Sequence, residues 1–249
     1  MTHDRTVDPR EVAFYSEMAA TWWDRQGPFW PLHTLNELRI SYIREQLCRH
    51  FDLDAAKDAP LSGLRVLDVG CGGGILAESM AKLGADVTGI DVVEKNIQIA
   101  RLHAGESGLD IDYRVLPASA LAADGYKFDV VLNMEVVEHV ADLDAFMRDC
   151  NELVEDGGAT VVATINRTWL AWLFAIVGAE YILRWLPRGT HRWSMFRTPR
   201  EVADLLGAAQ ISVVDTVGVA ANPFTRTLRQ VRSTQVNYMM FCTRSRADR

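Results

Sequence analysis

The sequence has few cysteines, no excess of basic residues and no apolar run long enough to cross a bilayer. Its four cysteines, Cys48, Cys71, Cys150 and Cys242, lie too far apart for a Cys-x-x-Cys pair or a zinc ribbon. The first ten residues are polar and lack the apolar core of a signal peptide, so we expect reduced thiols in a cytoplasmic protein. A net charge of −7 excludes the usual nucleic-acid binder, because such domains are normally basic.

What the chain does contain is an ordinary globular composition and a regular alternation of strands and helices. Hydrophobic residues make up 49% of the 249 residues and charged residues 24%, which excludes a disordered or fibrous chain. Strands alternating with helical windows favour a parallel sheet with helices on both faces. We therefore predict an α/β fold with a doubly wound, mostly parallel sheet of seven strands, at about residues 65–69, 85–91, 111–115, 128–133, 159–165, 211–218 and 236–243.

Two helices are predicted before the first strand. Asp8, Pro9 and Glu11 have the spacing of a helix start with a capping box. Phe14, Met18 and Trp22 then recur every four residues and form one apolar stripe. After a loop at residues 24–33, a second helix is expected over about residues 35–48.

A glycine-rich turn follows the first core strand. At the turn Gly70–Gly74, glycine permits positive φ angles and a close approach of the backbone to a ligand. Asp91 ends the next strand about twenty residues later, where a carboxylate can bind ribose hydroxyls. A dinucleotide fingerprint would need a glycine at Ile75. Asp68, just before the turn, suits a cationic sulfonium and amino group better than a pyrophosphate. The turn therefore predicts S-adenosylmethionine as the ligand.

Residues 66–74 resemble the cofactor loop of class I S-adenosylmethionine-dependent methyltransferases, which have a Rossmann-like fold. Further stretches resemble the ubiquinone-biosynthesis O-methyltransferase family, at residues 22–24, 31–33 with 38–39, 134–139, 177–183 with 189–191, and 237–239. The resemblance covers nearly the whole chain, from about residue 12 to residue 238. It implies an enzyme that methylates a ring hydroxyl twice in ubiquinone synthesis, on a polyprenyl hydroxyphenol and later on demethylubiquinol.

The resemblance also implies which residues bind the cofactor. By position these are Arg39, Gly70, Asp91 and Met134; the guanidinium of Arg39 can form a bidentate pair with the methionine carboxylate, and Met134 would pack against the adenine. The loop argument adds Asp68 and Gly72. Without the resemblance, Arg39 would be interpreted as part of a surface ion pair.

Glu135, Glu138 and His139 follow the end of the fourth strand at spacings of three and one. If this segment were helical, the three side chains would share one face at the ligand-binding edge of the sheet. Because a phenol is mostly neutral at pH 7, methyl transfer needs help with deprotonation. Either His139 acts as the general base, or the three residues hold Mg²⁺, which would lower the pKa of the bound hydroxyl. His33 and His191 are weaker candidates for the base.

An insertion breaks the α/β rhythm after residue 165. Residues 169–177 are apolar on every side of a predicted helix, and four of the seven tryptophans lie between residues 169 and 193. Residues 184–200 then carry five arginines and no acidic residue. This combination predicts docking onto an anionic membrane surface. We expect the protein at the inner face of the membrane, where it would take its polyprenyl substrate from the bilayer.

Together these features predict one methyltransferase domain. It would comprise an N-terminal helical cover (1–62), a cofactor-binding core (63–165), a membrane- and substrate-facing insertion (166–198) and a C-terminal helix with strands (199–249). The insertion is expected to be helical near residues 167–197. Other enzymes of the quinone pathway are possible partners. Three alternatives stay open: a methyltransferase for another quinone or lipid acceptor, a nicotinamide-dependent oxidoreductase, and a non-catalytic membrane adaptor.

Overall fold

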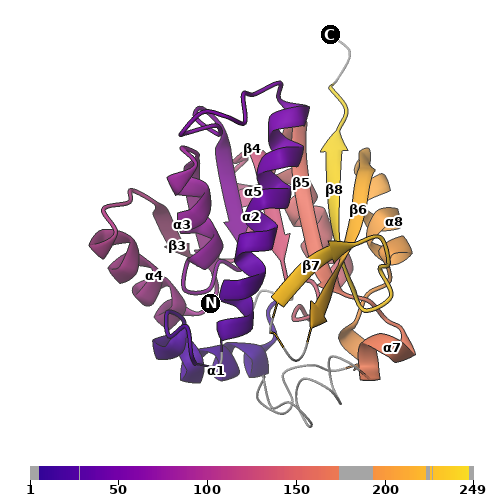
Figure 1. Cartoon of the computed structure of the whole chain (residues 1–249), viewed down its shortest axis with the longest axis horizontal. Helices are drawn as coiled ribbons and strands as arrows, with labels where there is room; N and C mark the ends of the chain where they lie inside the picture. The colour runs from indigo at the N-terminus through magenta and orange to yellow at the C-terminus, as the bar shows by residue number, and fades with distance from the viewer. Residues whose placement is uncertain (1–5, 28, 174–192, 223–224, 226, 247–249) are drawn as a thin grey trace.

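The computed structural model describes residues 6–27, 29–173, 193–222, 225 and 227–246. Within these residues the chain forms an eight-stranded sheet in the order β3-β2-β1-β4-β5-β8-β6-β7 (Figure 1). The strands are β1 Arg65–Val69, β2 Asp86–Asp91, β3 Asp112–Val115, β4 Phe128–Met134, β5 Val154–Ile165, β6 Ile211–Asn222, β7 Thr227–Val231 and β8 Asn237–Arg244. Strands β1 to β5 pair in parallel, whereas β8, β6 and β7 add antiparallel pairs. The mostly parallel α/β sheet is confirmed, and β7 is a strand that the sequence did not predict.

Helices cover both faces of the sheet, and alternate residues of each strand pack on opposite faces. The helices are α1 Pro9–Met18, α2 Trp30–His50, α3 Ile75–Lys82, α4 Glu94–Glu106, α5 Ala118–Ala123, α6 Leu143–Glu152, α7 Trp169–Ala171 and α8 Pro199–Gly207, with 3-10 turns η1 Ala19–Thr21 and η3 Trp193–Met195. Val66 of β1 belongs to the core beneath α2, α3 and α4, and Leu67 to the core beneath α5, α6 and α8. The central strands are buried on both sides, as parallel strands usually are.

The N-terminal cover differs from its prediction at two boundaries. Helix α1 ends at Met18 and a 3-10 turn follows, so Trp22 lies beyond the helix whose stripe it was expected to continue. Helix α2 begins at Trp30 rather than at residue 35, because Pro31 fits the first turn of a helix, where its missing N–H costs nothing. The longer α2 lies along the sheet, and α1 crosses near the carboxyl ends of the parallel strands (Figure 1).

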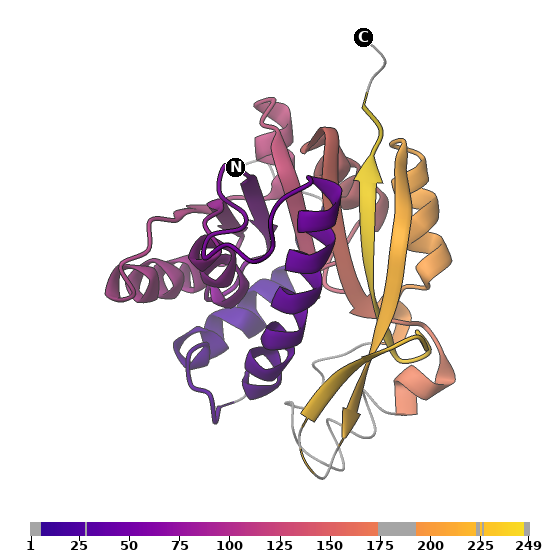
Figure 2. The ribbon, with the colours of Figure 1, turned by 45° about the horizontal axis from the view of Figure 1, so that its top comes forward.

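The hairpin of β6 and β7 extends beyond the main body of the sheet toward α2 (Figure 2). It lies at the same end of the molecule as α1 and α7 (Figures 1 and 2). Residues 174–177 of the predicted apolar helix 169–177 fall outside the described residues, and so do residues 184–192 of the basic stretch, which include His191. Among the residues that are described, no helix is long and apolar enough to cross a membrane.

Candidate active site

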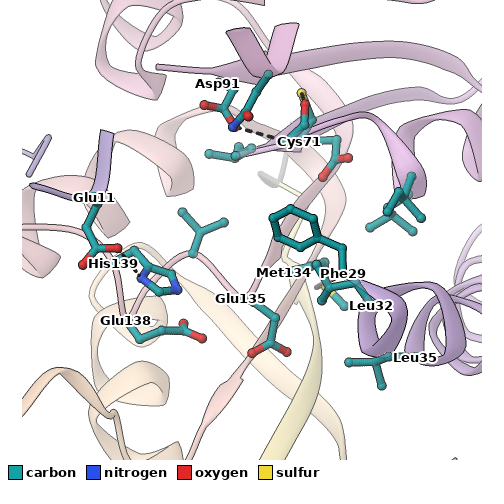
Figure 3. Close-up of a pocket in the computed structure, with 18 of the residues that line it drawn as sticks. Glu11, Phe29, Leu32, Leu35, Cys71, Asp91, Met134, Glu135, Glu138 and His139 are labelled. Carbon is teal, nitrogen blue, oxygen red and sulfur yellow. Dashed lines mark hydrogen bonds and ion pairs between the residues drawn. The ribbon is translucent and has the colours of Figure 1, made fainter. Parts of the chain in front are cut away.

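A cavity of about 930 Å³ opens at the carboxyl ends of β1, β2 and β4. In doubly wound sheets this edge is where ligands bind. The lining comes from the loop after β1, the ends of β2 and β4, helices α1 and α2, and the β6–β7 hairpin. Pockets for one small ligand usually measure roughly 300–1,000 Å³, so this cavity is at the upper end of that range. Figure 3 shows Asp91 on one side of it and Glu135, Glu138 and His139 on the other.

The glycine turn after β1 is held open by its backbone geometry. Gly70, Gly72 and Gly74 have φ angles of +67°, +54° and +87°, which side chains other than glycine rarely adopt. A Cβ at Gly72 would lie 2.5 Å from the Trp22 ring. The Gly72 N–H donates to Asp91 Oδ2 at 3.0 Å. The turn therefore needs glycine both for its angles and for the aromatic ring that covers it.

Asp91 organises this turn while facing the cavity. Its Oδ1 accepts from the Val93 N–H at 2.7 Å, and its Oδ2 also accepts from Asn96 Nδ2 at 3.3 Å. Burial raises the pKa of Asp91, and these hydrogen bonds oppose the rise. Asp91 therefore lies at the edge of the cavity, and its binding to ribose hydroxyls stays a prediction.

Asp68 and Arg39 are buried ions with unpaired atoms in the cavity wall. Asp68 is 3% exposed and Arg39 is 5% exposed. Asp68 Oδ2 and Arg39 Nε have no hydrogen-bond partner, although buried polar atoms are normally paired. Burial raises the pKa of Asp68 to about 7, which the nearby Arg39 charge partly opposes. A ligand that carries both an ammonium and a carboxylate would satisfy these two atoms, which is what the methionine end of S-adenosylmethionine offers.

Met134, the last residue of β4, is 8% exposed and lines the same cavity. Val92 and Leu116 also line this cavity, so parts of its walls are apolar. Such walls suit a flat adenine ring. All six predicted cofactor residues therefore border one cavity. They are Arg39, Asp68, Gly70, Gly72, Asp91 and Met134.

Trp22 and Trp23 form a cover over the turn that the sequence indicated only through the family resemblance. Trp22 lies against Gly72 and Gly73, stacks on Phe29 at 3.9 Å, and donates from Nε1 to Asn96 Oδ1 at 2.8 Å. Trp23 Nε1 donates to the Gly73 carbonyl at 2.9 Å. The N-terminal cover is thus joined directly to the cofactor turn.

The segment after β4 is a turn and not a helix, since α6 begins only at Leu143. Glu135 has a φ of +58°, which is uncommon outside glycine. The helical arrangement considered for Glu135, Glu138 and His139 is therefore wrong. The turn nevertheless brings all three side chains to the cavity wall (Figure 3).

Each of these three side chains already has a protein partner. Glu135 forms an ion pair with Arg39. Glu138 Oε2 accepts from Thr164 Oγ1 at 2.7 Å. Burial raises the pKa of Glu138 well above its ordinary value, and the neighbouring Glu135 raises it further. Burial therefore favours the neutral form of the Glu138 carboxyl.

His139 Nδ1 lies 3.0 Å from Glu11 Oε2 of helix α1. The capping box expected at Asp8 and Glu11 is therefore absent: Asp8 accepts from the Arg10 N–H, and the Glu11 carboxylate turns to His139. Glu11 is a site residue that the sequence did not reveal, because 128 positions separate it from His139.

The metal site predicted from this cluster does not fit the observed arrangement. Glu135, Glu138 and His139 are directed to Arg39, Thr164 and Glu11 respectively. In the described part of the chain, no group of three or more His, Cys, Asp or Glu side chains is placed to hold an ion.

His33 has a structural contact instead of a place in the cavity wall. Its Nε2 lies 2.9 Å from the Trp22 carbonyl, and burial lowers its pKa. This contact supports the position of Trp22, which covers the glycine turn. The other weak base candidate, His191, lies outside the described residues.

Residues 14–216 match the sequence model of a family described as a methyltransferase domain. The chain is 51% identical to a ubiquinone biosynthesis O-methyltransferase of Brucella anthropi over 96% of both chains. It is 52% identical to one of Roseobacter denitrificans over 94% of this chain and 95% of the relative. The chain belongs to the ubiquinone biosynthesis O-methyltransferase family.

Solved structures agree with this assignment at the level of the fold. The magnesium protoporphyrin IX methyltransferase of Synechocystis, solved with bound S-adenosylhomocysteine, is 17% identical and gives a TM-score of 0.66 over 94% of this chain. The protein is thus an S-adenosylmethionine-dependent O-methyltransferase with a class I fold, and the oxidoreductase alternative is excluded by the family.

Proposed function

We propose that this O-methyltransferase transfers the methyl group of S-adenosylmethionine to ring hydroxyls of two ubiquinone precursors, a polyprenyl hydroxyphenol and demethylubiquinol. The names of its relatives support the pathway. The observation that carries the site assignment is the pair of unsatisfied buried atoms, Asp68 Oδ2 and Arg39 Nε, beside the glycine turn. One cavity wall thus offers a negative and a positive group to a zwitterionic ligand.

The cosubstrate is held by residues of the turn and its cover. Arg39 binds its carboxylate, Asp68 binds its ammonium, and Asp91 binds the ribose hydroxyls. Met134 contacts the adenine. Gly70 and Gly72 let the backbone of the turn approach the cosubstrate closely. The bound group supplies a methyl on a positively charged sulfur. Trp22 covers that end of the cavity.

The acceptor occupies the remaining space, toward α1, α2 and the hairpin. Phe14, Leu35, Val219, Leu228 and Val231 give this part apolar walls. An apolar wall suits an isoprenoid chain, because burying its surface is favourable at roughly 25 cal/mol per Å². The phenol ring then lies near the segment that follows β4.

His139 is the proposed general base. His139 Nδ1 lies 3.0 Å from the Glu11 carboxylate, which can accept the Nδ1–H and orient the ring, and in this proposal Nε2 takes the phenol proton. In Figure 3 the second ring nitrogen is turned toward the cavity. Glu138 is less suited to this role, because its carboxyl is fully buried and accepts a hydrogen bond from Thr164, and burial raises its pKa.

A role for Mg²⁺ held by Glu135, Glu138 and His139 stays a prediction. Because each of these side chains already has a protein partner, and the Glu138 carboxyl is also hydrogen-bonded to Glu135, we derive no step of the reaction through an ion. An ion held there would need the Glu135 carboxylate to leave Arg39 and the Glu138 carboxyl to be ionised, which its burial opposes.

The test is transfer of labelled methyl from S-adenosylmethionine to a short-chain prenyl catechol in detergent, with Mg²⁺ and with EDTA. Label on a ring oxygen in both conditions supports the acceptor and the base His139. Label only with Mg²⁺ supports the acceptor and restores the metal site. Label on a ring carbon, or no label despite binding of S-adenosylmethionine, contradicts the proposed acceptor chemistry.

The exposed tryptophans of the insertion support a further proposal, that the protein docks on an anionic membrane surface at the inner face of the membrane. Trp169, Trp172 and Trp193 are exposed at 68%, 45% and 38%. Tryptophan is enriched where proteins meet lipid headgroups. Association with other enzymes of the quinone pathway would place them at the same surface.

A further inference from the structure

Glu135 occupies the part of Arg39 that a bidentate carboxylate would use. A guanidinium presents a side-on fork made of Nε–H and the Nη2 hydrogen on the same side, and a carboxylate binds it with both oxygens. In the structure Glu135 Oε1 accepts from Arg39 Nη2, and Nε, the other half of the fork, has no partner. One carboxylate oxygen thus fills half of a two-oxygen site.

The backbone of Glu135 is fixed in a conformation that makes this contact. Its φ of +58° is uncommon for a residue with a side chain, and such outliers concentrate at functional sites. The Glu135 N–H donates to the Ala163 carbonyl at 2.9 Å, which anchors it to β5. The side chain is 26% exposed, whereas that of Arg39 is 6% exposed. Glu135 therefore has room to move, and Arg39 has almost none.

We propose that Glu135 is a latch: it holds Arg39 in the absence of cosubstrate, and the cosubstrate carboxylate displaces it from Nη2. The displaced Glu135 carboxylate is then available to the hydroxyl groups of the acceptor on its side of the cavity. Binding of the cosubstrate thereby prepares the acceptor site, so that the two sites are coupled through one arginine. The proposal rests on the proposed function for the contact between Arg39 and the methionine carboxylate.

The latch predicts an unusual sign for a substitution in the site. Glu135→Gln removes the competing charge, so S-adenosylhomocysteine should bind more tightly, with Kd lower by roughly three- to tenfold. If Glu135 merely lined the site, its substitution would weaken the binding of S-adenosylhomocysteine. Calorimetry with S-adenosylhomocysteine and with 5′-methylthioadenosine, which has no carboxylate, measures the effect. The second ligand should bind wild type and Glu135→Gln equally.

Two further variants separate the latch from a general effect of charge. Glu138→Gln removes a carboxyl of the same turn that is not on Arg39 and keeps a hydrogen-bond donor toward Glu135, so it should leave the Kd unchanged. Arg39→Met keeps the apolar stem, and in that background Glu135→Gln should have no effect. Equal or weaker binding of S-adenosylhomocysteine by Glu135→Gln overturns the latch. An equal gain in Glu138→Gln, or for 5′-methylthioadenosine, also overturns it.

Coupling to the acceptor is measured with a prenyl catechol as the probe. Saturating S-adenosylhomocysteine should tighten its binding to wild type and should leave its binding to Glu135→Gln unchanged. Equal coupling in both proteins would contradict the latch. If the acceptor assignment itself is wrong, the catechol binds neither protein while the result with S-adenosylhomocysteine is unaffected, so the two failures are distinguishable.

Discussion

In the protein without ligand, the buried charges of Asp68 and Arg39 are only partly compensated: Arg39 is paired with Glu135, but Asp68 Oδ2 and Arg39 Nε have no hydrogen-bond partner. A buried polar atom without a partner costs about 1–3 kcal/mol, and each of these residues has one such atom. The cost falls on the empty protein and is recovered when a zwitterion binds. These two residues therefore lower the free energy of unfolding of the ligand-free protein and favour binding of the ligand.

Asp68→Asn should separate these two effects. The uncharged amide should raise the free energy of unfolding of the ligand-free protein at pH 8 by about 1–3 kcal/mol, because it removes a desolvated charge. The same change should weaken binding of S-adenosylmethionine. Thermal melts without and with ligand measure both effects. A variant that is less stable without ligand would contradict the interpretation of Asp68 as a binding residue.

The raised pKa of Asp68, about 7, also predicts how binding depends on pH. The ammonium of the ligand needs the ionised carboxylate, so affinity should fall by about tenfold per pH unit well below pH 7. The stability of the ligand-free protein should show the opposite sign. Because the folded state keeps its proton up to about pH 7, Asp68 makes folding less favourable as pH rises from about 4 to 7. Titration calorimetry at several pH values, with Asp68→Asn as the control, checks the first effect.

His139 and Glu11 should act as a pair. His139→Gln should lower kcat by about 10²–10⁴-fold, the usual contribution of a general base, and leave the affinity for S-adenosylmethionine unchanged. Glu11→Gln should lower kcat less, because it only orients the ring. In the His139→Gln background, Glu11→Gln should add little. Independent, multiplying losses would show that Glu11 does not work through His139.

Among the elements, the N-terminal cover is bound to the cofactor turn through Trp22 and Trp23. Trp23 also stacks on His103 at 3.4 Å, and His103 Nδ1 lies 2.5 Å from the buried Glu78 of α3. The cover thus contacts α3, α4 and the turn between β1 and α3. Its position depends on ring contacts with residues distant in sequence.

Trp22→Ala should raise the Kd for S-adenosylmethionine by about tenfold or more, because it uncovers Gly72 and leaves a cavity. Trp23→Phe is the matched control: it keeps a ring beside His103 and loses only the hydrogen bond to Gly73, which is worth about 1 kcal/mol. Binding followed by calorimetry distinguishes the two. Equal affinities of wild type and Trp22→Ala would show that the cover does not contribute to cofactor binding.

The elements also show what the sequence could predict. Gly70, Gly72, Asp68 and Asp91 lie within one β-α-β unit, so their roles follow from local spacing. The partnership of Trp22 with Asn96 spans 74 positions, and no pattern in the chain encodes it. The same reason hides the contact of Arg39 with Glu135. Contacts of this kind depend on how the N-terminal cover packs.

Strand β7 was missed for a different reason. Its residues Thr227–Val231 are all exposed or half-buried, so the apolar period of a core strand is absent. As an edge strand, it obtains its position by pairing with β6. The sequence also could not predict that a turn follows β4, because Glu135 adopts a left-handed conformation that its residue type does not indicate.

On the scale of the whole molecule, the acceptor side of the cavity and the insertion share one end. The β6–β7 hairpin lines the cavity, and α7 lies beside that hairpin in both views (Figures 1 and 2). Trp169 and Trp172 are exposed there. A protein docked by this end would turn its acceptor side toward the lipid, so a polyprenyl substrate would enter with little of its chain crossing water.

Docking by this end predicts that Trp169→Ala with Trp172→Ala weakens binding to anionic vesicles. Binding of wild type should be strong at low salt and fall as salt is raised, since exposed charges are screened. Leu102→Ala is the matched control, because Leu102 is 61% exposed on α4, which lies on the opposite side of the molecule from α7 (Figure 1). Cosedimentation with vesicles measures the binding, and transfer to a short-chain catechol in detergent should be equal in all three proteins. If the double variant sediments as wild type does, or if wild type ignores anionic vesicles at low salt, the membrane-facing surface is not at this end.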